Sequence, residues 1–438
     1  MEFRDALSFL DGHVNLEATA GRIHGLSLEA IRGLVGSMGD PQADLAAIHV
    51  TGTNGKGSVV AMAGALLTAA GLRVGTYTSP HVDTIRERIK ISGELISEEE
   101  FADLVADLAR YAATLDDRPS YFELLTAGAF LWFSNEAVDA AVVEVGLLGR
   151  FDATNVIESA VSVITNIGFD HTDGAGEWRR AIAGEKAGII ESGRPLVLGD
   201  TSVDLLDIFV AEGPDPLFVR GADFGVASSS PAVGGQVLDL FGPFGRHDEV
   251  YMPLHGAHQA DNAAVAVTAV EAMLGTELGD DVVSEAFADL TFPGRLELVS
   301  NRPLVVLDAA HNPEAARALV ETVPDVFPGA RRILVLGMLG PRSPGPVVAE
   351  LARLAPDLVL VFPAPSPRAV LAEELELACR KQGLEVETAP DVTEAVRRAV
   401  ALADEDDLVV VTGSFYVLPG ARGAVEGLAR SEGGEFEA

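Results

Sequence analysis

VTGTNGKGS, residues 50–58, is the stretch of sequence that decides the fold. It stands between an apolar run, AIHVT at 47–51, and a helical stretch, SVVAMAGALLTAAG at 58–71. Glycines let a backbone bend around a polyphosphate, and a helix N-terminus offers N–H groups to it. The stretch therefore predicts a phosphate-binding loop between a strand and a helix. Its predicted contacts to nucleotide are Gly52, Thr53, Asn54, Gly55, Lys56, Gly57 and Ser58.

The loop departs from the common GxxxxGK[ST] spacing, because two residues separate Gly52 from Gly55 and Gly57 stands between Lys56 and Ser58. A chance glycine-rich turn would explain the glycines, but not a lysine at the junction between strand and helix. Lys56 can reach the terminal phosphates, and Ser58 could bind Mg²⁺ or cap the helix. We therefore interpret the loop as a nucleotide site.

Outward from the loop, short apolar runs continue to alternate with helical stretches. A strand is expected at 72–78, and the runs at 139–145, 160–166 and 195–199 are nearly continuous, as expected for strands buried on both faces of a parallel sheet. The segment 213–250 is rich in Gly, Pro and Ser and predicts an antiparallel appendage. The first part of the chain is thus predicted to be α/β.

A second series of strands and helices begins after FPGRLE at 292–297, with the runs PLVVLDA, RRILVLG, DLVLVFP and DLVVVTG. The predicted fold class is α/β, with a P-loop ATPase-type parallel-sheet domain at 1–294 that carries the small antiparallel appendage. A Rossmann-like, doubly wound domain follows at 295–438. The Pro-Gly pair at 293–294 is the predicted hinge.

Composition excludes several classes of partner. The chain has 31 Lys and Arg residues and 66 Asp and Glu residues, and the resulting net charge of −35 repels nucleic acid. The most apolar stretch, 124–133, covers ten residues, against the roughly 20 that span a bilayer. No basic and apolar export signal opens the sequence, and its one cysteine, Cys379, cannot form an internal disulfide. We expect a cytoplasmic protein without membrane contact, and a buried apolar role for Cys379.

The loop variant GTNGKGS resembles that of the Mur ligase superfamily, and eight further segments narrow the resemblance to its folylpolyglutamate and dihydrofolate synthase branch. These are TSPHVDTIRERIKISG (78–93), SYFELLTAGAF (120–130), EVGLLGRFDATN (144–155), ITNIGFDHTD (164–173), GEKAGII (184–190), GAHQADNAAVA (256–266), FPGRLE and LDAAHNP (307–313). Each is weak alone, but together they follow the family's order over nearly the whole chain. The resemblance implies an ATP-dependent ligase that joins L-glutamate to dihydropteroate or a reduced folate.

Such a ligase must convert a carboxylate into a mixed anhydride with phosphate before an amine can attack it. Catalysis then depends largely on positioning and on cationic stabilisation of the transferred phosphoryl group. By resemblance, Ser79 and Glu144 hold one Mg²⁺, for which Ser58 of the loop is a further candidate ligand, and His171 holds a second. From the residues alone Glu144 is the most telling, because a carboxylate at the end of an apolar strand is disfavoured unless it is paired or metal-bound. His171 alone could equally be a loop histidine.

Further positions are assigned by resemblance. Lys186 lies in a small, apolar setting and is a predicted catalytic residue, which the family also carries as a carbamate; the alternative is a surface lysine beside Glu185. Arg295, at the predicted hinge, is expected to contact ATP phosphates, and with Lys56, Lys186 and His171 it completes the predicted catalytic set. Other predicted nucleotide contacts are Gln259, Asn262, Asp308 and His311, although a buried amide role is an alternative for the first two. A monovalent cation is also implied.

For the folate-type substrate the candidates are Arg86, Phe122, Glu123 and Arg150, each of which could instead serve packing or ion pairing.

Three segments depart from the family. Leu148 stands where glycine is usual and would be strained at positive φ. Residues 337–345, GMLGPRSPG, lack an acidic, lysine-containing stretch, and Ala309 replaces a glycine. The first departure puts the metal turn in doubt, and the second puts the acceptor in doubt.

Two other functions stay open on the sequence. One is a different Mur-type ligase, acting on a cell-wall precursor or on a pathway-specific acid, although the SPH and SYFE segments argue against the wall precursor. The other is a nucleotide-binding homologue without activity. We expect a monomer; the number of glutamates added cannot be read from the residues.

Overall fold

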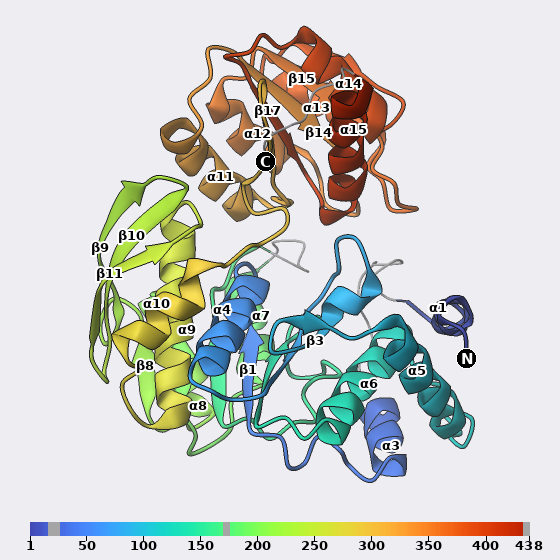
Figure 1. Ribbon diagram of the computed structural model, residues 1–438, viewed down its shortest axis with the longest axis vertical. Coiled ribbons are helices and arrows are strands. Elements are labelled where there is room, and N and C mark those ends of the chain that lie inside the picture. Colours follow the sequence, from blue (N-terminus) through green and yellow to red (C-terminus); the bar gives the residue numbers. More distant parts are fainter. Residues whose placement is uncertain (16–26, 170–175, 432–438) are drawn as a thin grey trace. The chain divides into compact units, whose positions relative to one another are not determined.

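The computed structural model describes residues 1–15, 27–169 and 176–431. The chain divides into two compact units, one holding most of residues 1–290 and the other the residues from 291 onward. Each unit is built around its own large β-sheet (Figure 1).

The first unit contains an eight-stranded sheet in the order β4-β3-β2-β5-β1-β6-β7-β8. Its strands are β1 (Ala47–Thr51), β2 (Val74–Tyr77), β3 (Ile89–Ile91), β4 (Glu94–Leu95), β5 (Ala140–Glu144), β6 (Val161–Ile164), β7 (Leu196–Leu198) and β8 (Leu217–Val219). The six strands from β2 to β8 in this order pair in parallel, whereas β3 and β4 add an antiparallel edge. Strands β1, β5, β6 and β7 are buried along their whole length, which explains their nearly continuous apolar sequences.

Helices cover this sheet. They are α1 (Phe3–Asp11), α3 (Glu29–Ser37), α4 (Lys56–Ala69), α5 (Glu98–Ala112), α6 (Tyr121–Asn135), α7 (Trp178–Ala187), α8 (Leu206–Ala211), α9 (Ala257–Leu274) and α10 (Asp280–Ala288). Helices α1, α3, α5 and α6 share one apolar cluster with β2 and β5, while α7 and α8 pack with β6 and β7. Capping boxes at Ser97 and Ser120 start α5 and α6.

A three-stranded antiparallel sheet is the predicted appendage. It consists of β9 (Gly225–Ala232), β10 (Gly235–Phe241) and β11 (Arg246–Met252), and β10 is the central strand. In Figure 1 it lies beside α9 and α10, and β11 contacts α10. The segment 213–250 also supplies β8, which joins the parallel sheet instead.

The second unit contains a six-stranded sheet in the order β12-β13-β17-β14-β15-β16, in which only the β12–β13 pairing is antiparallel. Its strands are β12 (Glu297–Asn301), β13 (Leu304–Leu307), β14 (Arg332–Leu336), β15 (Leu358–Val361), β16 (Val386–Thr388) and β17 (Leu408–Thr412). Its helices are α11 (Pro313–Val326), α12 (Gly345–Leu351), α13 (Ala372–Lys381), α14 (Val392–Leu402) and α15 (Leu418–Ser431).

The α/β fold class is confirmed, with its mostly parallel sheet, its small antiparallel sheet and its second, mostly parallel sheet. Strands β3, β4, β8, β12 and β16 were not predicted; they lie at or next to sheet edges, and all but β12 have only two or three residues. Cys379 is buried in α13, and burial raises the pKa of its thiol to about 11. Within the described residues, no helix combines the length and apolarity needed to cross a bilayer.

Candidate active site

The candidate site lies where the parallel strands of the first unit end. Because β1, β2, β5, β6 and β7 run in parallel, their carboxyl ends share one edge of the sheet. The segments that follow these ends are the glycine-rich loop after Thr51, Thr78–Ser79, the turn after Glu144, Thr165–Asn166 and Gly199–Asp200. Most of the predicted site residues of this unit therefore meet at one edge.

Two glycines of the loop are fixed by close neighbours. Gly52 has φ 150°, and a Cβ built on it would lie 1.8 Å from Oγ1 of Thr165. Gly55 has φ 83° and caps α4, and its Cβ would lie 2.4 Å from Oδ1 of Asn262. Only glycine combines these conformations with so little space. The loop is thus held between the end of β6 and the start of α9.

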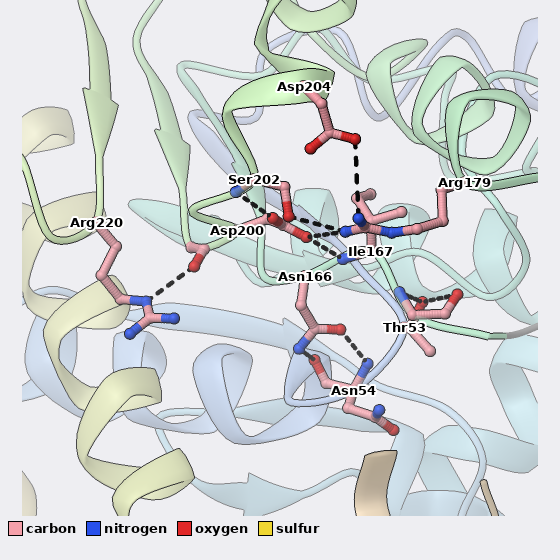
Figure 2. A network of polar contacts seen from close by, with 11 residues as sticks. Thr53, Asn54, Asn166, Ile167, Arg179, Asp200, Ser202, Asp204 and Arg220 are labelled. Atoms are coloured by element: carbon pink, nitrogen blue, oxygen red, sulfur yellow. Dashed lines mark hydrogen bonds and ion pairs between the residues drawn. The ribbon is translucent and has the colours of Figure 1, made fainter. Parts of the chain in front are cut away.

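Hydrogen bonds continue the pairing of β1 with β6 into the loop (Figure 2). The N–H of Thr53 donates to the carbonyl of Asn166 at 3.1 Å, and its Oγ1 accepts from the N–H of Gly168 at 3.0 Å. The backbone of Asn54 is bonded through both its N–H and its carbonyl, to Asn166 and to Thr165. Thr165 and Asn166 were missed from the sequence, although both lie in the family segment 164–173.

Two lysine side chains converge on one carbonyl of this loop. Nζ of Lys186, on α7, donates to the carbonyl oxygen of Gly52 at 2.8 Å, and Nζ of Lys56 donates to the same oxygen at 3.1 Å. Lys56 also reaches the carbonyl of Thr53 at 3.3 Å. Lys186 is only 2% exposed, which excludes the alternative of a surface lysine. Two ammonium groups this close repel each other, so an anion beside them would be strongly stabilised.

The acidic side of the same edge is formed by Glu144. This carboxylate is 4% exposed, and its Oε2 accepts from the N–H of Ser79 at 3.0 Å. A Cβ on Gly57 would lie 3.5 Å from that oxygen, which places Glu144 beside the first turn of α4, where Ser58 is buried. Glu144 therefore lies beside Ser79 and beside the turn of α4 that carries Ser58. Among the described residues, no group of three His, Cys, Asp or Glu side chains could hold a metal by itself.

The turn after Glu144 is organised by a buried aspartate that the sequence reading missed. Asp152 accepts from the N–H groups of Leu147 at 2.7 Å and Thr154 at 3.0 Å, and from the hydroxyl of Thr154 at 2.5 Å. Burial raises the pKa of Asp152, and these hydrogen bonds oppose the rise. Thr154 also contacts His49 of β1, whose pKa burial lowers to about 3. An Asp two residues before a Thr is the only signal in the sequence.

Leu148, the first departure from the family, has φ 60°. The backbone of this turn therefore has a positive φ at the position where leucine stands in place of the family's glycine. Its carbonyl accepts from the hydroxyl of Thr51 at 2.6 Å, and its side chain packs on the apolar cluster of α7, α8, β6 and β7. The turn is therefore tied to the start of the phosphate loop.

On α9, Gln259 and Asn262 are both buried, and Nδ2 of Asn262 donates to Oε1 of Gln259 at 3.1 Å. Asn262 lies against Gly55, as described above. Between them, Asp261 forms an ion pair of 2.7 Å with Arg220, whose Nε also donates to the carbonyl of Gly199 at 2.8 Å (Figure 2). A buried amide role is therefore established for both residues, and a role in nucleotide binding stays a prediction.

The four substrate-side candidates divide into two kinds. Phe122 lies over the turn, because a Cβ on Gly146 would be 2.4 Å from its Cζ. Glu123 completes the capping box of α6, and Arg86 donates from Nη1 to the carbonyl of Ile96 at 3.1 Å. Arg150 forms an ion pair with Glu212 and donates to the carbonyl of Gly184 at 3.2 Å. Phe122 is thus at the site edge, while the other three have structural contacts.

In the second unit, a compact cluster follows β13 and β17. Asp308 is buried and accepts from the N–H groups of Leu296 at 3.0 Å and Ala310 at 2.9 Å. Burial raises its pKa, and the charge of Arg295 opposes the rise. The guanidinium of Arg295 lies 4.7 Å from the ring centre of Phe415. The ring centres of His311 and Phe415 are 6.1 Å apart. Phe415, which was not predicted, therefore joins the three predicted residues.

Two further features of the sequence are His171 and the departure from the family at 337–345. His171 lies outside the described residues. The departure at 337–345 is the connection between β14 and α12, where the guanidinium of Arg368 donates to the carbonyl of Gly340 at 2.9 Å and 3.2 Å.

Comparison with known proteins identifies the family. The Mur ligase middle domain matches residues 50–270, and the Mur ligase glutamate ligase domain matches residues 294–415. A dihydrofolate synthase/folylpolyglutamate synthase of Mycobacterium tuberculosis is 40% identical over 435 residues, covering 90% of this chain and 89% of the relative. The chain belongs to the dihydrofolate synthase/folylpolyglutamate synthase family of Mur ligases. A Bacillus subtilis relative of the same description is 34% identical and covers 96% of this chain and 98% of its own.

Solved structures of this folate ligase family agree with the fold. The folylpolyglutamate synthase of M. tuberculosis, solved in complex with ADP and AMPPCP, matches with a TM-score of 0.88 and 37% identity over 99% of each chain. E. coli FolC, solved with DHPP and ADP, matches with a TM-score of 0.85 and 29% identity, also over 99% of each chain. The family resemblance inferred from the sequence motifs is confirmed.

Proposed function

We propose that this chain joins L-glutamate to the carboxylate of a folate-type acceptor, dihydropteroate or a reduced folate, and cleaves ATP to ADP and phosphate. Membership of the folate ligase family supports this reaction, and nucleotide-bound relatives support ATP as its nucleotide. The observation of this structure that carries the proposal is the convergence of Lys56 and Lys186 on the Gly52 carbonyl, at the same sheet edge as Glu144. That arrangement suits a polyphosphate and its counter-ions.

The proposed chemistry has two steps. An oxygen of the acceptor carboxylate forms a bond to the γ-phosphorus, and the bond from that phosphorus to the bridging oxygen breaks, which releases ADP. The glutamate nitrogen then bonds to the acyl carbon while the bond to phosphate breaks. The nitrogen gives up its proton to solvent. Both steps concentrate negative charge on phosphate oxygens, so cationic side chains lower their barriers.

The loop and its lysines have separate roles in the proposal. Backbone N–H groups at residues 52–58 bind the phosphates, and Lys56 neutralises the terminal ones. Lys186, held beside them, is a second cation. Gln259 and Asn262 serve the nucleotide base, Arg295 serves the phosphates, and Asp308 and His311 contact the nucleotide or its γ-phosphate. Arg86, Phe122, Glu123 and Arg150 serve the acceptor, for which Phe122 has the best position.

Magnesium fits the donors present. One buried carboxylate and two hydroxyls, on Glu144, Ser58 and Ser79, are hard oxygen ligands of the kind that Mg²⁺ prefers, and they would hold the ion. The ion would neutralise charge on the transferred phosphoryl group. A second Mg²⁺ at His171, a carbamate on Lys186 and a monovalent cation extend the proposal by family resemblance. So do a monomeric state and a cytoplasmic location.

The first prediction tests the loop. Replacing Lys56 with Ala removes the cation at the terminal phosphates, so glutamate-dependent release of phosphate should fall by at least about 100-fold. Lys381→Ala, at the exposed end of α13, is the matched control and should keep the wild-type rate. Near-normal turnover by Lys56→Ala would remove the loop from the mechanism.

The acceptor is identified by a panel. Phosphate release is measured with dihydropteroate, reduced folates and a cell-wall precursor, each with and without L-glutamate. We expect release only when a pterin-containing acid and glutamate are both present. Release that depends on the wall precursor, or on no acceptor, would overturn the proposed substrate class while leaving nucleotide binding intact.

A further inference from the structure

The side chain of Asn166 is paired with the main chain of the phosphate loop (Figure 2). Its Oδ1 accepts from the N–H of Asn54 at 2.9 Å, and its Nδ2 donates to the carbonyl of Asn54 at 3.0 Å. The hydroxyl of Thr165 donates to the same carbonyl at 2.6 Å. Asn166 thus acts on Asn54 as a neighbouring strand would, although it does so with a side chain.

These bonds fix the direction of two successive peptide groups. In a planar trans peptide the carbonyl and the N–H point in opposite directions. The peptide between Thr53 and Asn54 turns its N–H toward Asn166 and its carbonyl toward Nζ of Lys56, at 3.3 Å. The next peptide turns the carbonyl of Asn54 toward Asn166, so the N–H of Gly55 must point away from Asn166. That N–H opens the run of donors at the start of α4.

The support behind Asn166 is itself anchored. The N–H of Ile167 donates to Oδ2 of Asp200 at 2.9 Å, and Asp200 also accepts from the N–H of Ser202 at 2.7 Å. Arg179 forms an ion pair of 3.7 Å with Asp200 and donates to the hydroxyl of Ser202 at 2.8 Å. Figure 2 shows this chain of contacts leading from the loop to the end of β7. Residues 165–167 are therefore held from both sides.

We infer that Asn166 is a positioning residue for nucleotide binding, which sets the orientation of the Asn54 and Gly55 peptides before any ligand arrives. The inference deepens the proposed function and rests on the loop being the nucleotide site. An amide suits this position, because its adjacent oxygen and nitrogen accept from the N–H and donate to the carbonyl of Asn54 without carrying charge. A carboxylate would keep the acceptor but would set an oxygen against the carbonyl of Asn54.

The test is Asn166→Asp, which has the same shape. ADP binding, measured by calorimetry at about pH 8, should weaken roughly 10- to 100-fold through the lost donor and the new repulsion. The KM for the folate-type acceptor and for glutamate should change by no more than about twofold.

Gln236→Glu is the matched control. It makes the same amide-to-acid change at a buried position of β10, where Oε1 accepts from the hydroxyl of Ser229 at 2.9 Å. It should leave ADP binding unchanged. Thr165→Val, which removes the other donor to the Asn54 carbonyl, gives a second measurement if Asn166→Asp does not fold, and should weaken ADP binding by roughly 3- to 10-fold.

Wild-type affinity for ADP in Asn166→Asp or in a folded Thr165→Val, or equal losses in Asn166→Asp and Gln236→Glu, would overturn the assignment. Failure of the wild-type protein to bind ADP is a different result, because it would refute the proposed nucleotide site itself.

Discussion

A buried lysine is tolerated at position 186 because its ammonium group has a main-chain acceptor. An ammonium ion without a partner in such a setting would be disfavoured. The Gly52 carbonyl meets this need, but Lys56 uses the same oxygen. The two ammonium groups therefore favour the binding of an anion, which would reduce the repulsion between them. Two lysines that lie 130 positions apart in the sequence (186 − 56) thus share one acceptor in the fold.

Leu148 offers a prediction at the scale of one residue. At φ 60°, a residue with a Cβ is strained by about 1 kcal/mol relative to glycine. Leu148→Ala loses packing and keeps the strain, whereas Leu148→Gly loses packing and releases it. Urea unfolding should therefore find Leu148→Gly more stable than Leu148→Ala, by about 1 kcal/mol.

The control pair lies at Leu377, an exposed residue inside α13. There Gly should be less stable than Ala by about 0.5–1 kcal/mol, the usual order in a helix. If Leu148→Ala were the more stable of its pair, the turn would have to adopt a different backbone conformation from the one described.

Sequence reasoning found side chains with distinctive chemistry and missed those that work through hydrogen bonds to the main chain. Lys56, Glu144 and Lys186 could be located because a charge in an apolar or glycine-rich segment needs a reason. Asn166 and Asp152 could not, because an amide or an aspartate after a strand is common in turns. What each of them bonds depends on a second segment, which only the fold brings near.

At the scale of elements, prediction succeeded where burial is complete. Strands β1, β5, β6 and β7 are buried throughout, so each appears in the sequence as a nearly continuous apolar run. The edge strands β4 and β16 have largely exposed residues and are two and three residues long. So short a strand has too few side chains to show the alternation of apolar and polar residues that predicts a strand. Its position in the sheet is set by pairing with the neighbouring strand.

The appendage is joined to α9 and α10 by a buried histidine on β11. His247 is 2% exposed, and its two ring nitrogens lie 3.0 Å from carboxylate oxygens of Glu271 and Asp280. Only the protonated ring can donate to both. The hydrogen bond to Glu271 is the main cause of the raised pKa of His247, and burial opposes it. The charged form therefore joins the three elements.

A pH dependence follows for the stability of this junction. Because the folded-state pKa is raised, the stabilisation is complete below the unfolded value of about 6.5 and is lost as the pH rises through the folded value. The difference in unfolding free energy between wild type and His247→Gln should thus be larger near pH 6 than near pH 9, by about 1 kcal/mol or more. Chemical denaturation at both pH values measures it.

Glu271→Gln provides the control for that measurement. It keeps an acceptor near the ring but removes the buried negative charge, so most of the pH-dependent difference should disappear. A difference between wild type and His247→Gln that grows toward high pH would contradict the charged junction.

At the scale of the whole molecule, the net charge of −35 sets the response to salt. Self-repulsion among like charges destabilises a compact state, and salt screens it. Raising KCl from about 20 mM to about 300 mM at pH 8 should raise the melting temperature of the protein. Choline chloride should have the same effect, whereas a rise seen only with KCl would indicate a bound potassium ion. A fall with both salts would contradict the argument.

The oxygen that receives both lysines belongs to the polypeptide backbone, and this has a genetic consequence. No codon change can delete a main-chain carbonyl, so an alanine scan of the site would never reveal this acceptor directly. Its influence would surface only through neighbours that steer the chain, such as the Thr165 hydroxyl pressed against Gly52. Replacing that peptide bond by an ester would not remove the oxygen either, but would weaken it as an acceptor, and both lysines should report the change.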